Sequence, residues 1–103
     1  MINLFQKVPS ISTEELAEKL AEPITLLDVR TPDEYRDGHI AKAISYPFEK
    51  IKRYQGEKEE LYIICQGGVR SKKAAKILKG KGYEVVNVRG GMNQWHGPVK
   101  GGK

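Results

Sequence analysis

The sequence is poor in residues that crosslink chains, hold metals or span membranes. Its 103 residues include one cysteine and two histidines. A single cysteine excludes an internal disulfide, and Cys65 with His39 and His96, far apart in the chain, provides too few ligands for a structural zinc site. No apolar run approaches the roughly 18 residues of a membrane span. The first ten residues lack the basic and apolar regions of a signal peptide. We therefore expect a cytoplasmic protein with no metal, no other cofactor and no membrane partner.

Acidic residues are scarce in the second half of the chain. Residues 61–103 contain nine Lys/Arg and one Asp/Glu, whereas residues 1–60 contain nine and twelve. A cationic setting favours a cysteine thiolate and attracts anions. The alternatives are a solvated helix face and a nonspecific nucleic-acid patch. Because no aromatics are interleaved, no nucleic-acid partner is expected. Between Leu61 and Tyr83 no residue is acidic, and the cations are Arg70, Lys72, Lys73, Lys76, Lys79 and Lys81.

The length and pattern of the chain predict one small α/β domain. A chain this short supports a single hydrophobic core. We expect a monomeric domain over residues 1–99 and a disordered tail over residues 100–103. Apolar runs predict strands over residues 24–29, 43–46, 61–64 and 83–88. Capping signals and apolar spacing predict helices over residues 13–21, 32–36, 48–54 and 71–81.

The alternation of strands and helices predicts a mainly parallel sheet with helices on both faces. Sheets of this kind bind ligands beyond the carboxyl ends of their strands. Cys65 follows the strand predicted over residues 61–64, so it lies at such an end. The Cys65 loop is therefore the first place to look for a functional site.

The Cys65 loop has features that favour chemistry over packing. Gly67 and Gly68 allow a sharp turn, and Ser71 is a good N-cap for the helix that follows. The amides of residues 66–71 are then able to converge around an exposed sulfur and stabilise negative charge. The competing interpretation is that Cys65 is a small buried hydrophobe and that the glycine pair is only a turn.

Three separated blocks of sequence carry a resemblance to the single-domain rhodaneses, a sulfurtransferase family. They are L-L-D-V-R-T-P-D-E-Y-R-D-G-H-I at residues 26–40, C-Q-G-G-V-R-S at residues 65–71, and G-Y-E-V-V-N-V-R-G-G-M-N-Q-W at residues 82–95. The resemblance implies a rhodanese-like α/β fold with a mostly parallel five-stranded sheet. It also implies that Cys65 takes the outer sulfur of thiosulfate, becomes a persulfide and passes the sulfur to cyanide or a thiol.

The resemblance assigns roles to individual residues. Cys65 is the expected catalytic residue, and Arg70 is expected to contact substrate in preference to pairing with a carboxylate. His39 is interpreted as structural, and Trp95 and Arg36 are left undecided as neighbours of the pocket. An internal hydrogen-bonded network is expected for Asp28, Arg30 and Glu34. The expected substrate-binding residues are Gln66, Gly67, Gly68, Val69, Arg70 and Ser71.

Two other functions compete with sulfur transfer. A phosphatase or arsenate reductase on the same scaffold needs one more residue between the cysteine and the arginine to hold a tetrahedral oxyanion, and the spacing from Cys65 to Arg70 is the shorter one. A noncatalytic sulfur-carrier or binding module is the second rival, although binding modules of this family typically lose the cysteine. We expect small anionic sulfur compounds as donors and a small thiol or a protein as acceptor.

Overall fold

The structure is a computed structural model that describes residues 7–56 and 59–102. Within these ranges, five strands form one parallel sheet in the order β1-β5-β4-β2-β3. The α/β class and the parallel sheet are thereby confirmed. The strands are β1 (Ser10–Ile11), β2 (Thr25–Asp28), β3 (Ala43–Ser45), β4 (Glu60–Ile64) and β5 (Glu84–Val88). The helices are α1 (Thr13–Lys19), α2 (Pro32–Asp37) and α3 (Val69–Gly80), with two 3-10 helices, η1 (Phe48–Arg53) and η2 (Gly91–Gln94).

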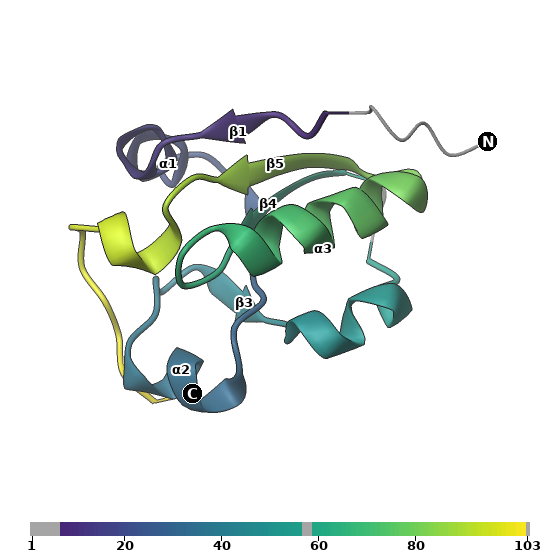
Figure 1. Ribbon diagram of the computed structural model, residues 1–103. Helices are drawn as coiled ribbons and strands as arrows, with labels where there is room; N and C mark the ends of the chain where they lie inside the picture. The colour runs from purple at the N-terminus through teal and green to yellow at the C-terminus, as the bar shows by residue number, and fades with distance from the viewer. Residues whose placement is uncertain (1–6, 57–58, 103) are drawn as a thin grey trace.

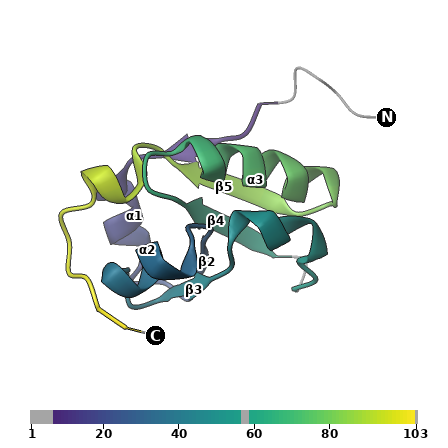
Figure 2. The ribbon, with the colours of Figure 1, turned by 60° about the horizontal axis from the view of Figure 1, so that its bottom comes forward.

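The central strands are apolar throughout because both faces of the sheet are covered. Leu27 and Ile63 pack on one face with side chains from α3 and η1, and Leu26 and Ile64 pack on the other with Leu16 of α1. In Figure 1, α3 runs in front of β4 and β5, and Figure 2 shows α1 and α2 on the other side of the molecule from α3. Burial on both faces explains why these strands do not alternate between apolar and polar residues.

The first two helices begin at the predicted capping boxes. Ser12 Oγ accepts from the Glu15 amide, and Glu15 returns a carboxylate oxygen to the Ser12 amide. Thr31 and Glu34 make the same pair of bonds at the start of α2. These local bonds satisfy amides that have no partner within the helix, so both starts are readable from sequence. The first helix ends at residue 19, two residues before its predicted end.

The third helix begins two residues earlier than predicted. Gly68, not Ser71, is its N-cap, with φ at 104° in the left-handed region. A glycine adopts this conformation without the Cβ penalty, so the chain enters the helix directly from the Cys65 loop. Ser71 lies in the first turn, where its hydroxyl donates to the Gly68 carbonyl at 3.1 Å. The prediction of Ser71 as N-cap was therefore wrong.

The C-terminal segment returns to α2. The main chains of His39 and Lys100 exchange two hydrogen bonds, and the Gly102 amide donates to the Arg36 carbonyl at 2.9 Å. Figure 1 shows this end of the chain beside α2. Disorder of residues 100–103 stays a prediction for the protein in solution, and Lys103 lies outside the described residues.

Candidate active site at the Cys65 loop

The candidate site lies at the carboxyl edge of the sheet. Cys65 follows β4 at the centre of the sheet, Arg30 lies just beyond the end of the adjacent β2, and the Gly90–Gly91 turn follows β5 on the other side. Parallel strands bring these three segments to one edge. Among the described residues, no group of His, Cys, Asp and Glu side chains is arranged to hold a metal ion. In the same part of the chain, no helix is long and apolar enough to cross a membrane.

The Cys65 sulfur lies inside the loop. The Gly68 amide donates to Sγ at 3.0 Å, and Sγ is 3.3 Å from the Ser71 hydroxyl. Only 1% of Cys65 is exposed. The prediction of an exposed thiol was wrong, because the loop turns back at Gly68 and places its own main chain over the sulfur. A donor or acceptor that reaches this sulfur must therefore be narrow or must displace the loop.

The Gly90–Gly91 turn supports the loop from below. The Met92 amide donates to the Cys65 carbonyl and the Asn93 amide donates to the Gln66 carbonyl, both at 2.9 Å. Gly91 has φ at 56°, and a Cβ placed there would lie 2.3 Å from the Cys65 carbonyl oxygen. This contact requires glycine. Nothing in the local sequence around Cys65 signals it, because Gly91 is 26 residues away in the chain.

Replacing Gly91 with alanine is expected to lower the free energy of unfolding by about 1–3 kcal/mol, because the new Cβ strains the turn and pushes against the Cys65 main chain. Gly80 is the matched control, since no atom lies within 4 Å of a Cβ placed there. Gly80→Ala in the last turn of α3 should be neutral or stabilising by up to about 1 kcal/mol. Urea unfolding of the two variants measures the difference, and equal stabilities would contradict the close contact.

Arg70 pairs with a carboxylate in this structure. Its guanidinium donates to both oxygens of Glu34 on α2, at 2.7 and 2.9 Å. This bond holds the pKa of Glu34 down at about 2 and raises the pKa of Arg70, to which nearby Cys65 also contributes. Contact between Arg70 and a substrate stays a prediction. The pair links α2 to the first turn of α3 and holds the cation beside the loop.

The Arg70–Glu34 pair should make stability depend on pH. Glutamate titrates near 4.3 in an unfolded chain, whereas the folded pKa of Glu34 is about 2. The pair therefore contributes stability that is complete above about pH 5 and is lost as pH falls toward 2. Urea unfolding should show the wild type more stable than Glu34→Gln at pH 6, with the two curves converging near pH 2. Parallel curves over this range would contradict the assignment.

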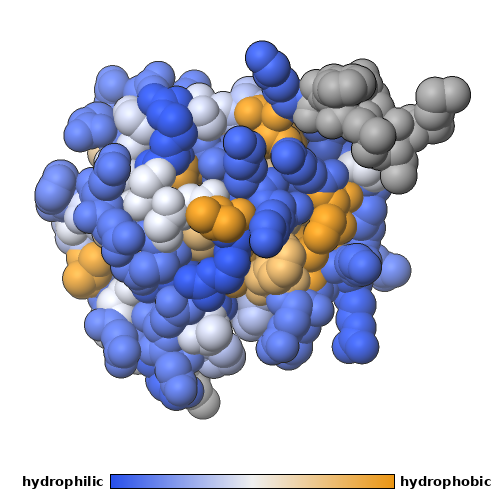
Figure 3. Space-filling model, viewed as in Figure 1, coloured by the Kyte–Doolittle hydropathy of each residue, from blue (hydrophilic) through white to orange (hydrophobic). Residues whose placement is uncertain are grey.

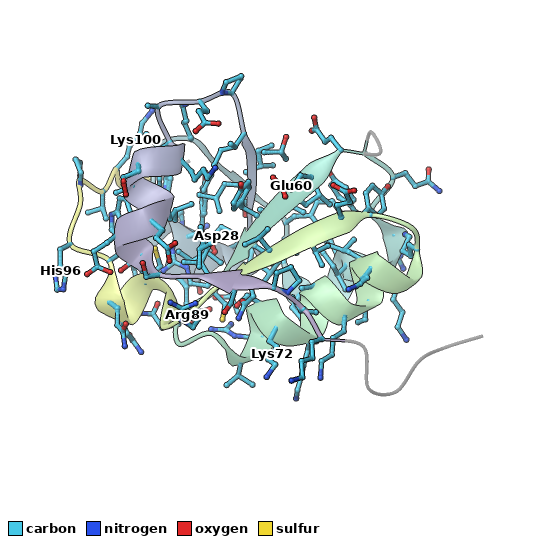
Figure 4. The ribbon with its side chains drawn as sticks, turned by 90° about the horizontal axis from the view of Figure 1, so that it is seen from above. Asp28, Glu60, Lys72, Arg89, His96 and Lys100 are labelled. Carbon is cyan, nitrogen blue, oxygen red and sulfur yellow. The ribbon has the colours of Figure 1, made fainter. Side chains whose placement is uncertain are left out.

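A buried network holds the other side of the loop, as predicted for Asp28 and Arg30. The Arg30 guanidinium donates to Asp28 Oδ2 at 2.8 Å, to the Gly38 carbonyl at 2.8 Å and to Gln66 Oε1 at 3.1 Å. The Gln66 amide then donates to Asn93 Oδ1 at 2.7 Å. Figure 4 shows Asp28 in the interior of the molecule. Gln66, predicted to bind substrate, thus joins β2 to η2, and the sequence gave no signal for Asn93.

A pocket of about 270 Å³ lies beside the loop. Glu34 and Gln66 line it, so it adjoins both the Arg70 pair and the residue after Cys65, but Cys65 itself does not line it. Asp37, which the sequence did not single out, adds a carboxylate. The lining residues are Arg30, Glu34, Asp37, Gly38, Gln66 and Met92.

The remaining predicted residues have separate places. Gly67 and Val69 are exposed on the loop, and 67% of Val69 is accessible. His39 is buried, stacks on Tyr35 and contacts the Tyr35 carbonyl through Nδ1 at 2.7 Å, which is the structural role predicted for it. Trp95 lines a second pocket of about 100 Å³ with residues of α1, and Arg36 pairs with exposed Asp33.

Comparison with known proteins gives a family match over most of the chain. A family model described as "Rhodanese-like domain" matches residues 12–98. A solved structure titled as a rhodanese-like domain protein from Staphylococcus aureus superposes with a TM-score of 0.84 at 37% identity, covering 93% of this chain and all of that one.

Curated relatives have names that refer to sulfur chemistry. The chain is 37% identical to a protein named "Sulfurtransferase" from Allochromatium vinosum, over 85% of this chain and 88% of the relative. It is 32% identical to "Thiosulfate sulfurtransferase GlpE" of Pseudoalteromonas translucida, over 88% and 89% of the two chains. It is 36% identical to YrkF of Bacillus subtilis, whose name describes a proposed sulfur carrier, over 90% of this chain. The match spans about half of YrkF, 54% of its length.

Proposed function

The chain belongs to the rhodanese-like domain family, and from this premise we propose that it is a sulfurtransferase that carries sulfur as a persulfide on Cys65. One observation supports this most strongly. The lone thiol lies at the carboxyl end of the central strand, within hydrogen-bonding distance of the Gly68 amide and the Ser71 hydroxyl. These groups are suited to stabilise a sulfur that carries negative charge.

The proposed reaction has two covalent steps. First, the Cys65 thiolate attacks the outer sulfur of thiosulfate, the sulfur–sulfur bond of thiosulfate breaks, and sulfite leaves with the bonding electron pair. Cyanide or a thiolate then attacks the outer sulfur of the Cys65 persulfide, and the Cys65 thiolate is released. Neither step needs a proton to be removed by a general base, provided that the thiols react as thiolates. Substrate-binding roles are proposed for the predicted loop residues, Gln66 to Ser71.

The position of the loop suits this charge balance. The first turn of α3 directs unpaired amides toward the loop, and helix N-termini favour anions. Arg70 lies in the same turn, close enough to Cys65 to interact electrostatically with it. The same groups would stabilise thiosulfate, the departing sulfite and the anionic persulfide. Sulfur chemistry therefore uses every charged or polar group that the loop presents.

Two rivals remain to be separated from this proposal. A phosphatase or arsenate reductase is disfavoured by the short spacing from Cys65 to Arg70. A sulfur carrier without turnover is supported by the name of YrkF. A carrier would take up sulfur once and keep it until a dedicated partner arrives, whereas a sulfurtransferase turns over with a small acceptor.

Steady-state assays distinguish the three functions. With thiosulfate and cyanide, a sulfurtransferase forms many equivalents of thiocyanate per protein molecule. A carrier forms one equivalent or none, and a phosphatase hydrolyses an aryl phosphate instead. Aryl phosphate hydrolysis without thiocyanate formation would overturn the proposal.

A further inference from the structure

The outer side of α3 carries cations that helix stability does not explain. Lys72, Lys73 and Lys76 are exposed, whereas Ala74, Ala75 and Leu78 face the core. The first turn of α3 contains Arg70 and no acidic residue, although helix N-termini disfavour cations. The lysines are also three and four residues apart, a spacing at which like charges repel.

These lysines lack the counter-charges that cations have elsewhere on the surface. Lys19 lies beside Glu22, Arg36 beside Asp33 and Arg89 beside Glu15. In the part of the chain that the structure describes, no salt bridge joins Lys72, Lys73 or Lys76 to a carboxylate. Their charge is therefore available to a partner.

An exposed apolar side chain lies where this basic face meets the Cys65 loop. Val69 is the first residue of α3 and is 67% accessible. Ser71, two residues on, contacts the Cys65 sulfur at 3.3 Å, so this region begins within one helical turn of the thiol. Figure 3 shows the side that carries α3 as mostly hydrophilic with a few separate apolar spots, and Figure 4 shows Lys72 on the outer side of α3. We call Val69, Lys72, Lys73 and Lys76 the docking face.

We propose that the docking face binds an acidic protein that takes the sulfur from Cys65, an inference that rests on the proposed sulfurtransferase function. Charge complementarity selects an acidic partner, and Val69 offers it an apolar contact beside the site. A nucleic acid fits less well, because the face contains no aromatic side chain for base stacking.

Burial of the thiol restricts the shape of the partner. With 1% of Cys65 exposed, a broad protein surface does not reach the sulfur. The partner must present its own thiol on a narrow tip, such as the end of a tail or a loop. In the transfer step, the partner thiolate attacks the outer sulfur of the Cys65 persulfide. The sulfur–sulfur bond to Cys65 breaks, a new one forms on the partner, and Cys65 leaves as thiolate.

Two synthetic acceptor peptides test this inference. One has four glutamates before a single cysteine, and the other has four glutamines in their place. The protein is first loaded with thiosulfate, and the rate of sulfur transfer to each peptide is followed by mass spectrometry. At low salt the wild type should prefer the glutamate peptide by about tenfold, through electrostatic attraction. The preference should vanish at about 0.5 M salt.

Charge reversal locates the effect. The triple variant Lys72→Glu, Lys73→Glu, Lys76→Glu should lose the preference yet still pass sulfur to dithiothreitol. The matched control reverses Lys50, Lys52 and Arg53, exposed cations on η1, and should keep the preference. Equal wild-type rates for the two peptides, or a preference that survives the α3 reversal, would overturn the docking face and leave sulfur transfer intact. Failure of the wild type to load would overturn both.

Discussion

Replacing Cys65 with serine is expected to lower the rate of sulfur transfer at least about a thousandfold. A serine hydroxyl is not ionised near neutral pH and does not form a persulfide, and the sequence contains no second thiol to replace it. Thiocyanate formation from thiosulfate and cyanide measures the loss. The fold should survive, because the serine oxygen is able to accept from the Gly68 amide as Sγ does.

A stability measurement and a second variant separate lost chemistry from lost structure. The free energy of unfolding of Cys65→Ser should lie within about 2 kcal/mol of the wild-type value, since the substitution changes one buried atom and keeps its hydrogen-bonding partners. Ser71→Ala keeps the thiol while removing its hydroxyl neighbour, so it should retain a rate well above that of Cys65→Ser. Thiocyanate formation by Cys65→Ser at a rate near that of the wild type would exclude Cys65 as the sulfur-carrying residue.

Replacing Asp28 with alanine is expected to give a large loss of stability, about 3–5 kcal/mol. Asp28 and Arg30 form a buried pair, with side chains 0% and 4% exposed. Removal of the carboxylate leaves the Arg30 charge in the interior without its counter-ion, and such a loss costs far more than an exposed pair does. The loss is a large share of the 5–15 kcal/mol by which small domains are stable. Urea unfolding at neutral pH measures it.

The chain provides a matched control for this variant. Asp33 and Arg36 form another aspartate–arginine pair, but their side chains are 83% and 50% exposed. Asp33→Ala should therefore cost less than about 1 kcal/mol. Because Arg30 also holds Gln66, the Asp28→Ala variant should lose sulfur transfer as well as stability, whereas Asp33→Ala should not. Similar unfolding free energies for the two variants would contradict the role given to the buried pair.

The sequence predicted those parts of the fold that depend on neighbouring residues. The capping boxes of Ser12 and Thr31 were identified because both partners lie within one helical turn. The central strands were identified because burial on both faces requires a continuous apolar run. The two-residue strand β1 was absent from the predicted pattern, because it is too short to show a period.

The features that the sequence did not reveal depend on distant residues. Arg70 lies beside Glu34 because α2 and α3 meet at the carboxyl edge of the sheet, a contact across 36 positions of the chain. The burial of Cys65 depends on the conformation of Gly68, and its support depends on Gly91. Local propensity carries no information on these contacts. The identity of the reactive residue was predicted, but its surroundings were not.

The most direct test of the central claim is the intact mass of the protein after incubation with thiosulfate. We expect the addition of one sulfur atom to the wild type, its loss when cyanide is added, and no addition in Cys65→Ser. The account would be contradicted if neither thiosulfate nor any persulfide donor adds sulfur to the wild type, or if the same mass increase appears in Cys65→Ser.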